Sequence, residues 1–237
     1  MTMRRNTTKI WFAVIAAWAY IISAEAQVSF RYKGETMNTN RHCLLVDDTK
    51  KAKEKHFLFA SVVDALAFAD KHNNEDFLWT DIYICPSVYW MDNPDEEAIR
   101  RPNPGEGTPY ALEVKASRLR LIGLGDSAEE VVLACNRGQT QGADGNFTMF
   151  HFLGSNVEAT NITFGNYCNV DLVYPKDKSK NRKRRKDAIV QAQIAICEGD
   201  NYRLDNCRFI SRLNLCPFVG AKHTVFNHCT FECTDDA

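Results

Sequence analysis

The sequence predicts an all-β protein, a β-helix solenoid with one helix near its N-terminus. From residue 110 onward, short apolar segments follow one another, separated by turn residues and with no amphipathic helix between them. In addition, an apolar pair returns at a fixed interval, because Cys207 and Phe209 are followed 22 positions later by Cys229 and Phe231. A repeat of this period is typical of solenoids, in which equivalent residues of successive coils stack.

The two copies of the repeat read LDNCRF (204–209) and FNHCTF (226–231). An earlier segment, ATNITF, ends in Phe164, which precedes Phe209 by 45 positions, close to two steps of 22. Stacked coils would place the Cys and Phe side chains of each copy in the interior, one above the other. The alternative is a β-sandwich in which this spacing is a coincidence.

The first 26 residues predict a cleavable secretory signal. A cationic start, MTMRRNTTK, is followed by the apolar run IWFAVIAAWAYII and then by the small residues Ala24 and Ala26. The run of about 13 residues is shorter than the roughly 20 that span a bilayer, which argues against a membrane anchor. We expect cleavage after Ala26, a secreted or periplasmic protein, and one domain over residues 27–237.

One helix and one strand have clear patterns before residue 110. Residues 59–73, FASVVDALAFADKHN, predict an amphipathic helix, because Ser61 can cap it with Asp64 three positions later. Its apolar residues then recur at helical spacing. The next segment, FLWTDIYICPSVYW (77–90), predicts a strand, since its apolar residues alternate before a proline.

Loops and short strands make up the rest of the chain. Residues 93–109 predict a loop by their proline, glycine and charge content, whereas residues 27–56 give no clear pattern. The strands that we expect after the loop read YALEVKA, RLRLIGLG, EVVLACN, TMFHFLG, VEATNITFGN, IAICEGD, YRLDNCRFI, PFVGA and HTVFNHCTFEC.

Composition and charge exclude several kinds of partner and site. With a formal net charge of −1, the protein has no overall electrostatic field that would attract nucleic acid or favour contact with a membrane. Nine cysteines in an exported protein would suggest disulfides, but the odd count and the spacing without pairs argue against a disulfide scaffold. No C-x-x-C pair or Cys/His cluster has zinc spacing, so we expect neither a metal nor a cofactor.

The run PKDKSKNRKRRKDA (175–188) is dense in Lys and Arg and has two interpretations. It is either a solvated loop between coils, which is the commoner role of a charge run, or a cationic lip that binds a polyanionic sugar chain. In the second interpretation Lys183, Arg184 and Arg185 contact the substrate.

Several segments resemble, in the same order, motifs of the pectin methylesterase family. ASVVDALAFA, IYICPSVYW and LRLIGLG are similar to the helix and strands that open that domain. NFTMFHFLGSNVEATNITFGN, QAQIAICEGDNYRLDNCRF and NHCTFECTDDA are similar to three later motifs, and Ser87 stands where the family has glycine. The resemblance covers about residues 58–237. It implies a right-handed, single-stranded parallel β-helix, pectin lyase-like, with an N-terminal helix.

The resemblance also implies a chemistry and a set of catalytic positions. The family uses an Asp nucleophile on the methyl ester of pectin, a second Asp as acid and base, two Gln amides for the oxyanion, and an orienting Arg. Gln191 matches the first Gln, and Asp236 matches the nucleophile, or Asp235 in an alignment without an inserted residue. Leu213 and Asn214 stand where the second Gln and the acid–base Asp are expected.

These two replacements leave two functions open. Losing one oxyanion donor costs about 10²–10³ in rate, and an Asn cannot carry the proton that is worth about 10²–10⁴. We therefore expect either a pectinesterase-like hydrolase of methyl esters in pectin or polygalacturonate, or a catalytically impaired β-helix that binds acidic polysaccharide. Arg212, beside Leu213 and Asn214, is a further candidate for substrate binding.

A lyase or glycosidase on this fold is a third alternative, but a lyase would need a carboxylate cluster for calcium, and the Asp pairs 47–48 and 235–236 are too isolated.

The chain stops on a predicted coil without a capping element, and the family's Arg would lie after Ala237. We expect the domain to be incomplete at its C-terminus, or to be covered there by a partner.

Overall fold

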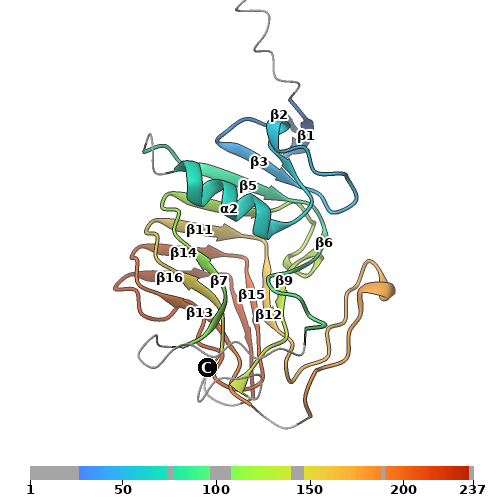
Figure 1. The fold of residues 1–237 in the computed structure, drawn as a ribbon, viewed down its shortest axis with the longest axis vertical. Helices are drawn as coiled ribbons and strands as arrows, with labels where there is room; N and C mark the ends of the chain where they lie inside the picture. The colour runs from blue at the N-terminus through green and yellow to red at the C-terminus, as the bar shows by residue number, and fades with distance from the viewer. Residues whose placement is uncertain (1–26, 74–76, 97–107, 140–146, 188–189, 235–237) are drawn as a thin grey trace, which may run out of the picture.

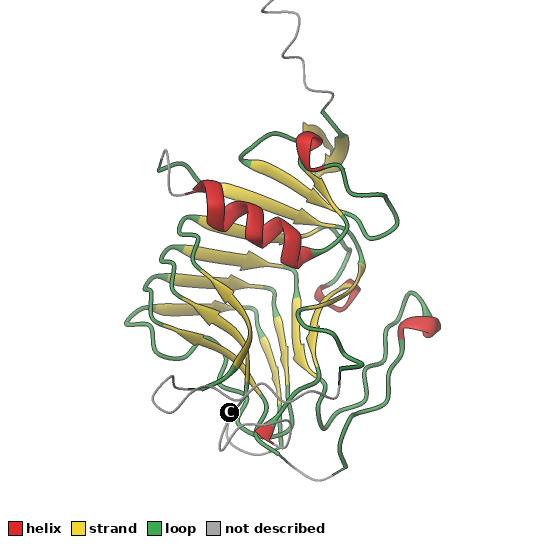
Figure 2. Ribbon diagram, viewed as in Figure 1, coloured by secondary structure: helices red, strands yellow, loops and turns green. Residues whose placement is uncertain are grey.

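A computed structural model describes residues 27–73, 77–96, 108–139, 147–187 and 190–234. Within these residues the chain winds into a parallel β-helix of three sheets around one core, which confirms the predicted fold class (Figures 1 and 2). The signal sequence predicted for residues 1–26 lies outside the described residues. No helix in the described ranges has the length and apolar character needed to cross a bilayer.

The three parallel sheets consist of strands from successive coils. The first contains β3 (Cys43–Val46), β4 (Leu58–Phe59), β5 (Thr80–Ile84), β8 (Leu119–Gly123), β11 (Val157–Thr160), β14 (Tyr202–Asp205) and β16 (Thr224–Asn227). The second contains β6 (Ser87–Trp90), β9 (Val131–Cys135), β12 (Thr163–Asn166), β15 (Arg208–Ile210) and β17 (Thr230–Glu232). The third contains β7 (Tyr110–Val114), β10 (Thr148–Phe152) and β13 (Gln193–Cys197).

Shorter elements complete the fold. An antiparallel pair, β1 (Ser29–Tyr32) and β2 (Glu35–Asn38), precedes the first coil. The 3-10 turns are η1 (Glu54–His56), η3 (Ala128–Glu130) and η5 (Lys178–Lys180).

The predicted helix is confirmed as α2 (Val62–His72), which begins three residues later than the predicted segment. The Ser61 hydroxyl caps it by accepting the Asp64 amide at 3.1 Å and donating to the Asp64 carboxylate at 2.7 Å. Its buried face contains Val62, Ala65, Leu66 and Ala69, and it packs against β3, β4, β5 and β7 at the N-terminal coils (Figure 1).

The repeated Phe residues stack as the 22-residue period predicts. Phe164 pairs with Phe209, and Phe209 pairs with Phe231, in adjacent strands of the second sheet. Their ring centroids are 5.5 and 5.2 Å apart and the rings are nearly parallel. The prediction that Phe164 lies close to two steps before Phe209 was wrong, because one coil contains all 45 positions. The additional residues form a long loop, residues 170–187, which we call the arm.

Left-handed residues divide the longer predicted strands. Asn161, Asn206 and His228 have φ angles of 60°, 49° and 52°, and each separates a strand of the first sheet from one of the second. VEATNITFGN, YRLDNCRFI and HTVFNHCTFEC therefore form two strands each rather than one. The segment PFVGA forms no strand, and its one ladder contact is an isolated bridge between Ile196 and Val219.

Candidate functional site

The arm lies against the outer face of the second sheet, at its N-terminal strands. Leu172 and Tyr174 of the arm pack in one apolar cluster with Val88, Val132 and Ile210 of the sheet. The Tyr174 hydroxyl also donates to the carbonyl of residue 130 at 2.9 Å. In Figure 1 the arm is the orange segment that projects at the right, with η5 near its tip. The arm thus covers part of the sheet, while β17 at its C-terminal edge is more exposed than β15.

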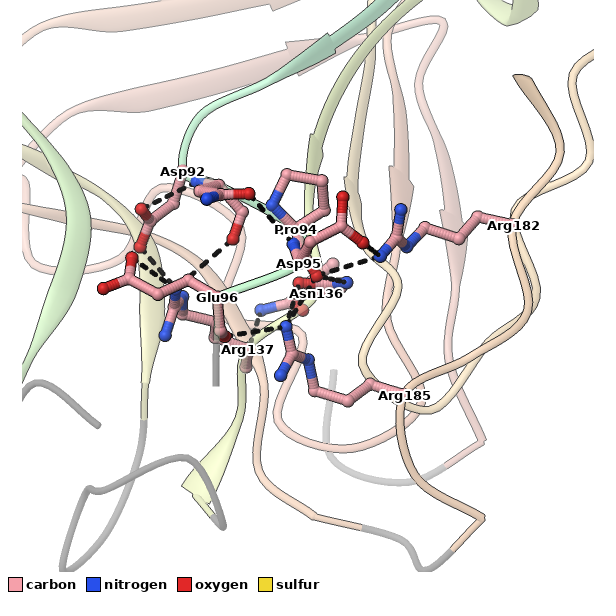
Figure 3. A network of polar contacts seen from close by, with 10 residues as sticks. Asp92, Pro94, Asp95, Glu96, Asn136, Arg137, Arg182 and Arg185 are labelled. Carbon is pink, nitrogen blue, oxygen red and sulfur yellow. Dashed lines mark hydrogen bonds and ion pairs between the residues drawn. The ribbon is translucent and has the colours of Figure 1, made fainter. Parts of the chain in front are cut away.

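A network of polar contacts fixes the base of the arm to the segment 92–96 (Figure 3). Arg182 donates to the Pro94 carbonyl at 3.0 Å and pairs with Asp95. Arg185 donates to the carbonyls of Pro94 at 2.7 Å and Glu96 at 3.2 Å. These cations therefore serve contacts within the protein.

A groove of about 780 Å³ opens between the arm and strands β15 and β17. The arm side, the sheet and the turn after β17 all contribute to its walls. The lining residues are Asn169, Val170, Asp171, Arg184, Ile210, Ser211, Arg212, Phe231, Glu232, Cys233 and Thr234.

Four charged residues line the groove, and they differ in their partners. Glu232 accepts Arg208 at 2.8 Å. Asp171 accepts the Lys183 ammonium at 2.7 Å and the Arg184 amide at 3.1 Å, and these hydrogen bonds lower its pKa. The carboxylates of the groove are therefore already neutralised by the protein.

The two groove cations are more available to a ligand. Arg212 is half-buried, and its side chain makes no ion pair or hydrogen bond with the residues that the structure describes. Its carbonyl accepts the Thr234 hydroxyl at 3.0 Å. Arg184 is exposed and pairs with Asp187 at 2.8 Å, on a carboxylate that is 91% exposed. An exposed pair of this kind is weak and can be replaced by a ligand anion.

The structure places the predicted catalytic positions on neighbouring coils. Gln191 lies just before β13, half-buried, and its carbonyl accepts the Gln139 amide at 2.9 Å. The Ala192 amide donates to the Leu213 carbonyl at 3.2 Å, so the segments after Gln191 and around Leu213 and Asn214 stack directly. Asn214 has a left-handed φ of 54°. None of these three side chains is among the groove-lining residues, and Asp235 and Asp236 lie outside the described residues.

The three predicted cations of the arm have different positions. Arg184 lines the groove, Lys183 is 90% exposed at its rim and paired with Asp171, and Arg185 points to the segment 92–96 instead. Neither a freely solvated loop nor a uniformly cationic lip describes this arm. The opposite charges of DNPDEE (92–97) and NRKRRK (181–186) were the signal in the sequence that could have indicated the docking.

The described part of the chain offers no obvious metal site. No group of three His, Cys, Asp or Glu side chains there is arranged to hold an ion. All nine cysteines are free thiols in this structure.

Comparisons with known proteins identify the fold. No family model matches the sequence, and no curated protein matches it. The structure is similar to a pectin methylesterase variant in complex with a hexasaccharide, with a TM-score of 0.50 and 16% identity over 81% of this chain and 49% of that one. It is similar to the pectin methylesterase from Aspergillus niger, with a TM-score of 0.51 and 13% identity over 83% of this chain and 52% of that one.

The pectin methylesterase from Erwinia chrysanthemi gives a comparable result, with a TM-score of 0.50 and 15% identity over 83% of this chain and 50% of that one. The chain thus spans about half the length of these enzymes. This protein therefore has the parallel β-helix fold of the pectin methylesterases, at a sequence identity that makes it divergent from them.

Proposed function

We propose that the groove binds an acidic polysaccharide of the pectin type. The observation that carries the proposal is Arg212, a half-buried residue that lines the groove and whose side chain makes no ion pair with the described residues. Arg184 lies on the opposite, arm side of the same groove. Guanidinium groups bind carboxylates through paired, charge-assisted hydrogen bonds, which suits the uronate units of de-esterified pectin.

The comparison with solved structures supports the same class of ligand. One of the similar pectin methylesterases is in complex with a hexasaccharide. A groove of about 780 Å³ is large enough for several sugar units, because small-ligand sites typically measure about 300–1,000 Å³. The groove also presents the exposed Thr234, whose hydroxyl donates to the Arg212 carbonyl and can accept a hydrogen bond from a sugar hydroxyl.

Binding without efficient hydrolysis is favoured by Leu213 and Asn214. By the family resemblance these positions would supply an oxyanion donor and an acid–base carboxylate. Leucine supplies no hydrogen-bond donor, and the amide of asparagine does not transfer a proton at neutral pH. We infer that the groove retains a ligand while the hydrolytic step is impaired.

Hydrolysis of pectin methyl esters is the second candidate, and the match of Asp236 to the family's nucleophile favours it. In that case another group replaces Asn214 as the acid. Methanol release from methylated pectin tests this function in the wild type and in Asp236→Asn. Release that disappears in the variant supports an esterase, whereas no release from the wild type excludes it for this chain.

The binding proposal is tested by titrating oligogalacturonate into the wild type, Arg212→Gln and Arg184→Gln. A charge-assisted hydrogen bond is worth about 1.5–3 kcal/mol, so we expect Arg212→Gln to weaken binding by about tenfold or more. Arg203→Gln is the matched control, since Arg203 is an exposed cation on β14 in the first sheet. Equal affinities for all four proteins would contradict the proposal.

We also propose that the protein is exported, which is the compartment where extracellular polysaccharide occurs. The support is the order of charged, apolar and small residues before Gln27. Mass spectrometry of the protein purified from its natural source should give an N-terminus at Gln27. A mature protein that retains Met1 would contradict export through this signal.

A further inference from the structure

We propose that Lys180, Asp48 and Ser87 form an anchor that holds the arm and thereby positions Arg184 in the wall of the groove. These are positioning residues rather than ligand contacts. Their effect on ligand binding rests on the proposed function, whereas the anchoring of the arm does not.

The anchor joins parts of the chain that are far apart in sequence. The Lys180 ammonium lies 2.6 Å from the Asp48 carboxylate, across 132 positions, and also contacts the Ser87 hydroxyl. The Ser87 hydroxyl donates to the same carboxylate at 2.6 Å. Ser87 is fully buried, and the side chains of Lys180 and Asp48 are 30% and 28% exposed. The ion pair is therefore partly shielded from water, where such contacts are stronger than on an open surface.

A serine beside a lysine could instead be a nucleophile with its base. Ser87 has no exposed surface, so no substrate carbonyl can approach its hydroxyl in this arrangement. The hydroxyl also donates its proton to Asp48, which fixes it as part of the anchor. The geometry therefore supports a structural contact.

Contacts within the arm connect Lys180 to Arg184, so that the position of one residue affects the position of the other. The two sides of the arm pair at Leu172 and Arg182 through backbone hydrogen bonds of 2.8 and 3.0 Å. The Arg184 amide is held by Asp171 on the opposite side at 3.1 Å. Lys180 lies in η5 near the tip, and Arg184 lies at the base, so the arm behaves as one hairpin (Figure 1).

Contacts at the base complete the attachment. Arg182 and Arg185, which flank Arg184 in the chain, dock on Pro94 and Asp95 or Glu96 (Figure 3). When the contact of Lys180 with Asp48 and Ser87 is lost, the contacts at the base of the arm remain. The two sides of the arm can then separate more often. We expect a more mobile Arg184 and weaker binding of a polyuronide, because disorder of a binding group costs affinity.

Limited trypsin digestion of the folded chain measures how often the arm opens, since the arm carries Lys and Arg residues from 176 to 186 at which trypsin cleaves. Removing the anchor in Asp48→Asn or in Lys180→Met should raise the cleavage rate within the arm by about fivefold or more, because cleavage follows the open population. Asp47→Asn is the matched control, since this neighbouring carboxylate contacts Thr49 and Lys50 and not the arm. Thermal unfolding of each variant identifies any that is globally destabilised.

Oligogalacturonate titration of the same variants completes the test. Faster arm cleavage together with an affinity reduced toward that of Arg184→Gln supports the proposal. Cleavage at the wild-type rate in both anchor variants overturns it. Faster cleavage with unchanged affinity, when Arg184→Gln is weakened, overturns the positioning role and leaves the proposed function intact. If the wild type does not bind at all, the proposed function and the positioning role both fail, and cleavage alone decides whether Lys180 anchors the arm.

Discussion

Arg137 is the most completely buried cation of the site region, with a side chain that is 1% exposed. It pairs with Asp92 at 2.8 Å and with Glu96 at 3.2 Å. The Asp92 side chain is itself 9% exposed, so both charges of the first pair are removed from water. This pair fixes the segment on which Arg182 and Arg185 of the arm dock (Figure 3).

We predict that Asp92→Asn destabilises the fold, because it removes the buried carboxylate that faces Arg137 and leaves the more exposed Glu96 as the carboxylate of this ion pair. Removal of one member of a buried ion pair costs about 3–5 kcal/mol. Asp95→Asn is the control, since the Asp95 side chain is 75% exposed in its pair with Arg182 and exposed pairs are worth about 0–1 kcal/mol. Urea unfolding measures both. Equal losses in the two variants would show that burial of the Arg137 pair has no energetic role.

Cys207 and Cys229 are equivalent residues of two adjacent coils, and their thiols interact. The interaction between the two side chains lowers the pKa of Cys229 and raises that of Cys207. Burial alone would raise the pKa of a thiol, so the interaction with Cys207 decides the direction at Cys229. The half-buried Cys229 is therefore the thiol of the pair that ionises at the lower pH.

We predict that iodoacetamide modifies Cys229 with a pH midpoint below that of an ordinary thiol, because the thiolate is the reacting form and its share rises as pH passes the pKa. In Cys207→Ala the midpoint should rise toward the ordinary thiol value of about 8.5. Cys233, which is also half-buried, provides the comparison within the same protein. Peptide mass spectrometry follows each site. An unchanged Cys229 profile in Cys207→Ala would rule out the thiol pair as the cause.

At the scale of elements, the stack of Phe164, Phe209 and Phe231 joins three coils of the second sheet. Phe209 is fully buried between the other two rings, whereas Phe231 is 43% exposed. We predict that Phe209→Ala costs about 3–5 kcal/mol. Phe231→Ala should cost about half as much, because part of its ring already contacts water. Thermal unfolding compares the two, and a larger loss in Phe231→Ala would contradict this account of the stack.

The regular part of these elements was predictable and the irregular part was not. The recurrence of Cys207 and Phe209 at Cys229 and Phe231 indicated a coil, because stacking requires the same residue type at the same position. The interval from Phe164 gave the wrong number of coils, since a loop inserted into one coil has the same length as a further coil. The spacing of repeated residues alone does not distinguish an inserted loop from a further coil.

At the scale of the whole molecule, the groove combines residues that sequence motifs separate. The family resemblance identified Gln191, Leu213 and Asn214, whose backbones lie on neighbouring coils but whose side chains are not among the groove-lining residues. The second wall of the groove could be predicted only in part. The opposite charges of residues 92–97 and 181–186 indicate where the arm can dock, whereas no local pattern indicates the contact of Lys180 with Asp48, 132 positions away.

The proposed function depends on recognition of the negative charge of a polyuronide by the groove. The most direct test is to measure, at one salt concentration, the affinity of the protein for polygalacturonate and for the same polymer fully methyl-esterified. Because Arg212 and Arg184 bind carboxylates and not their esters, we predict that the acidic polymer binds about tenfold or more tightly. The preference should decrease as salt screens the charges. Equal affinities, or tighter binding of the esterified polymer, would contradict the account.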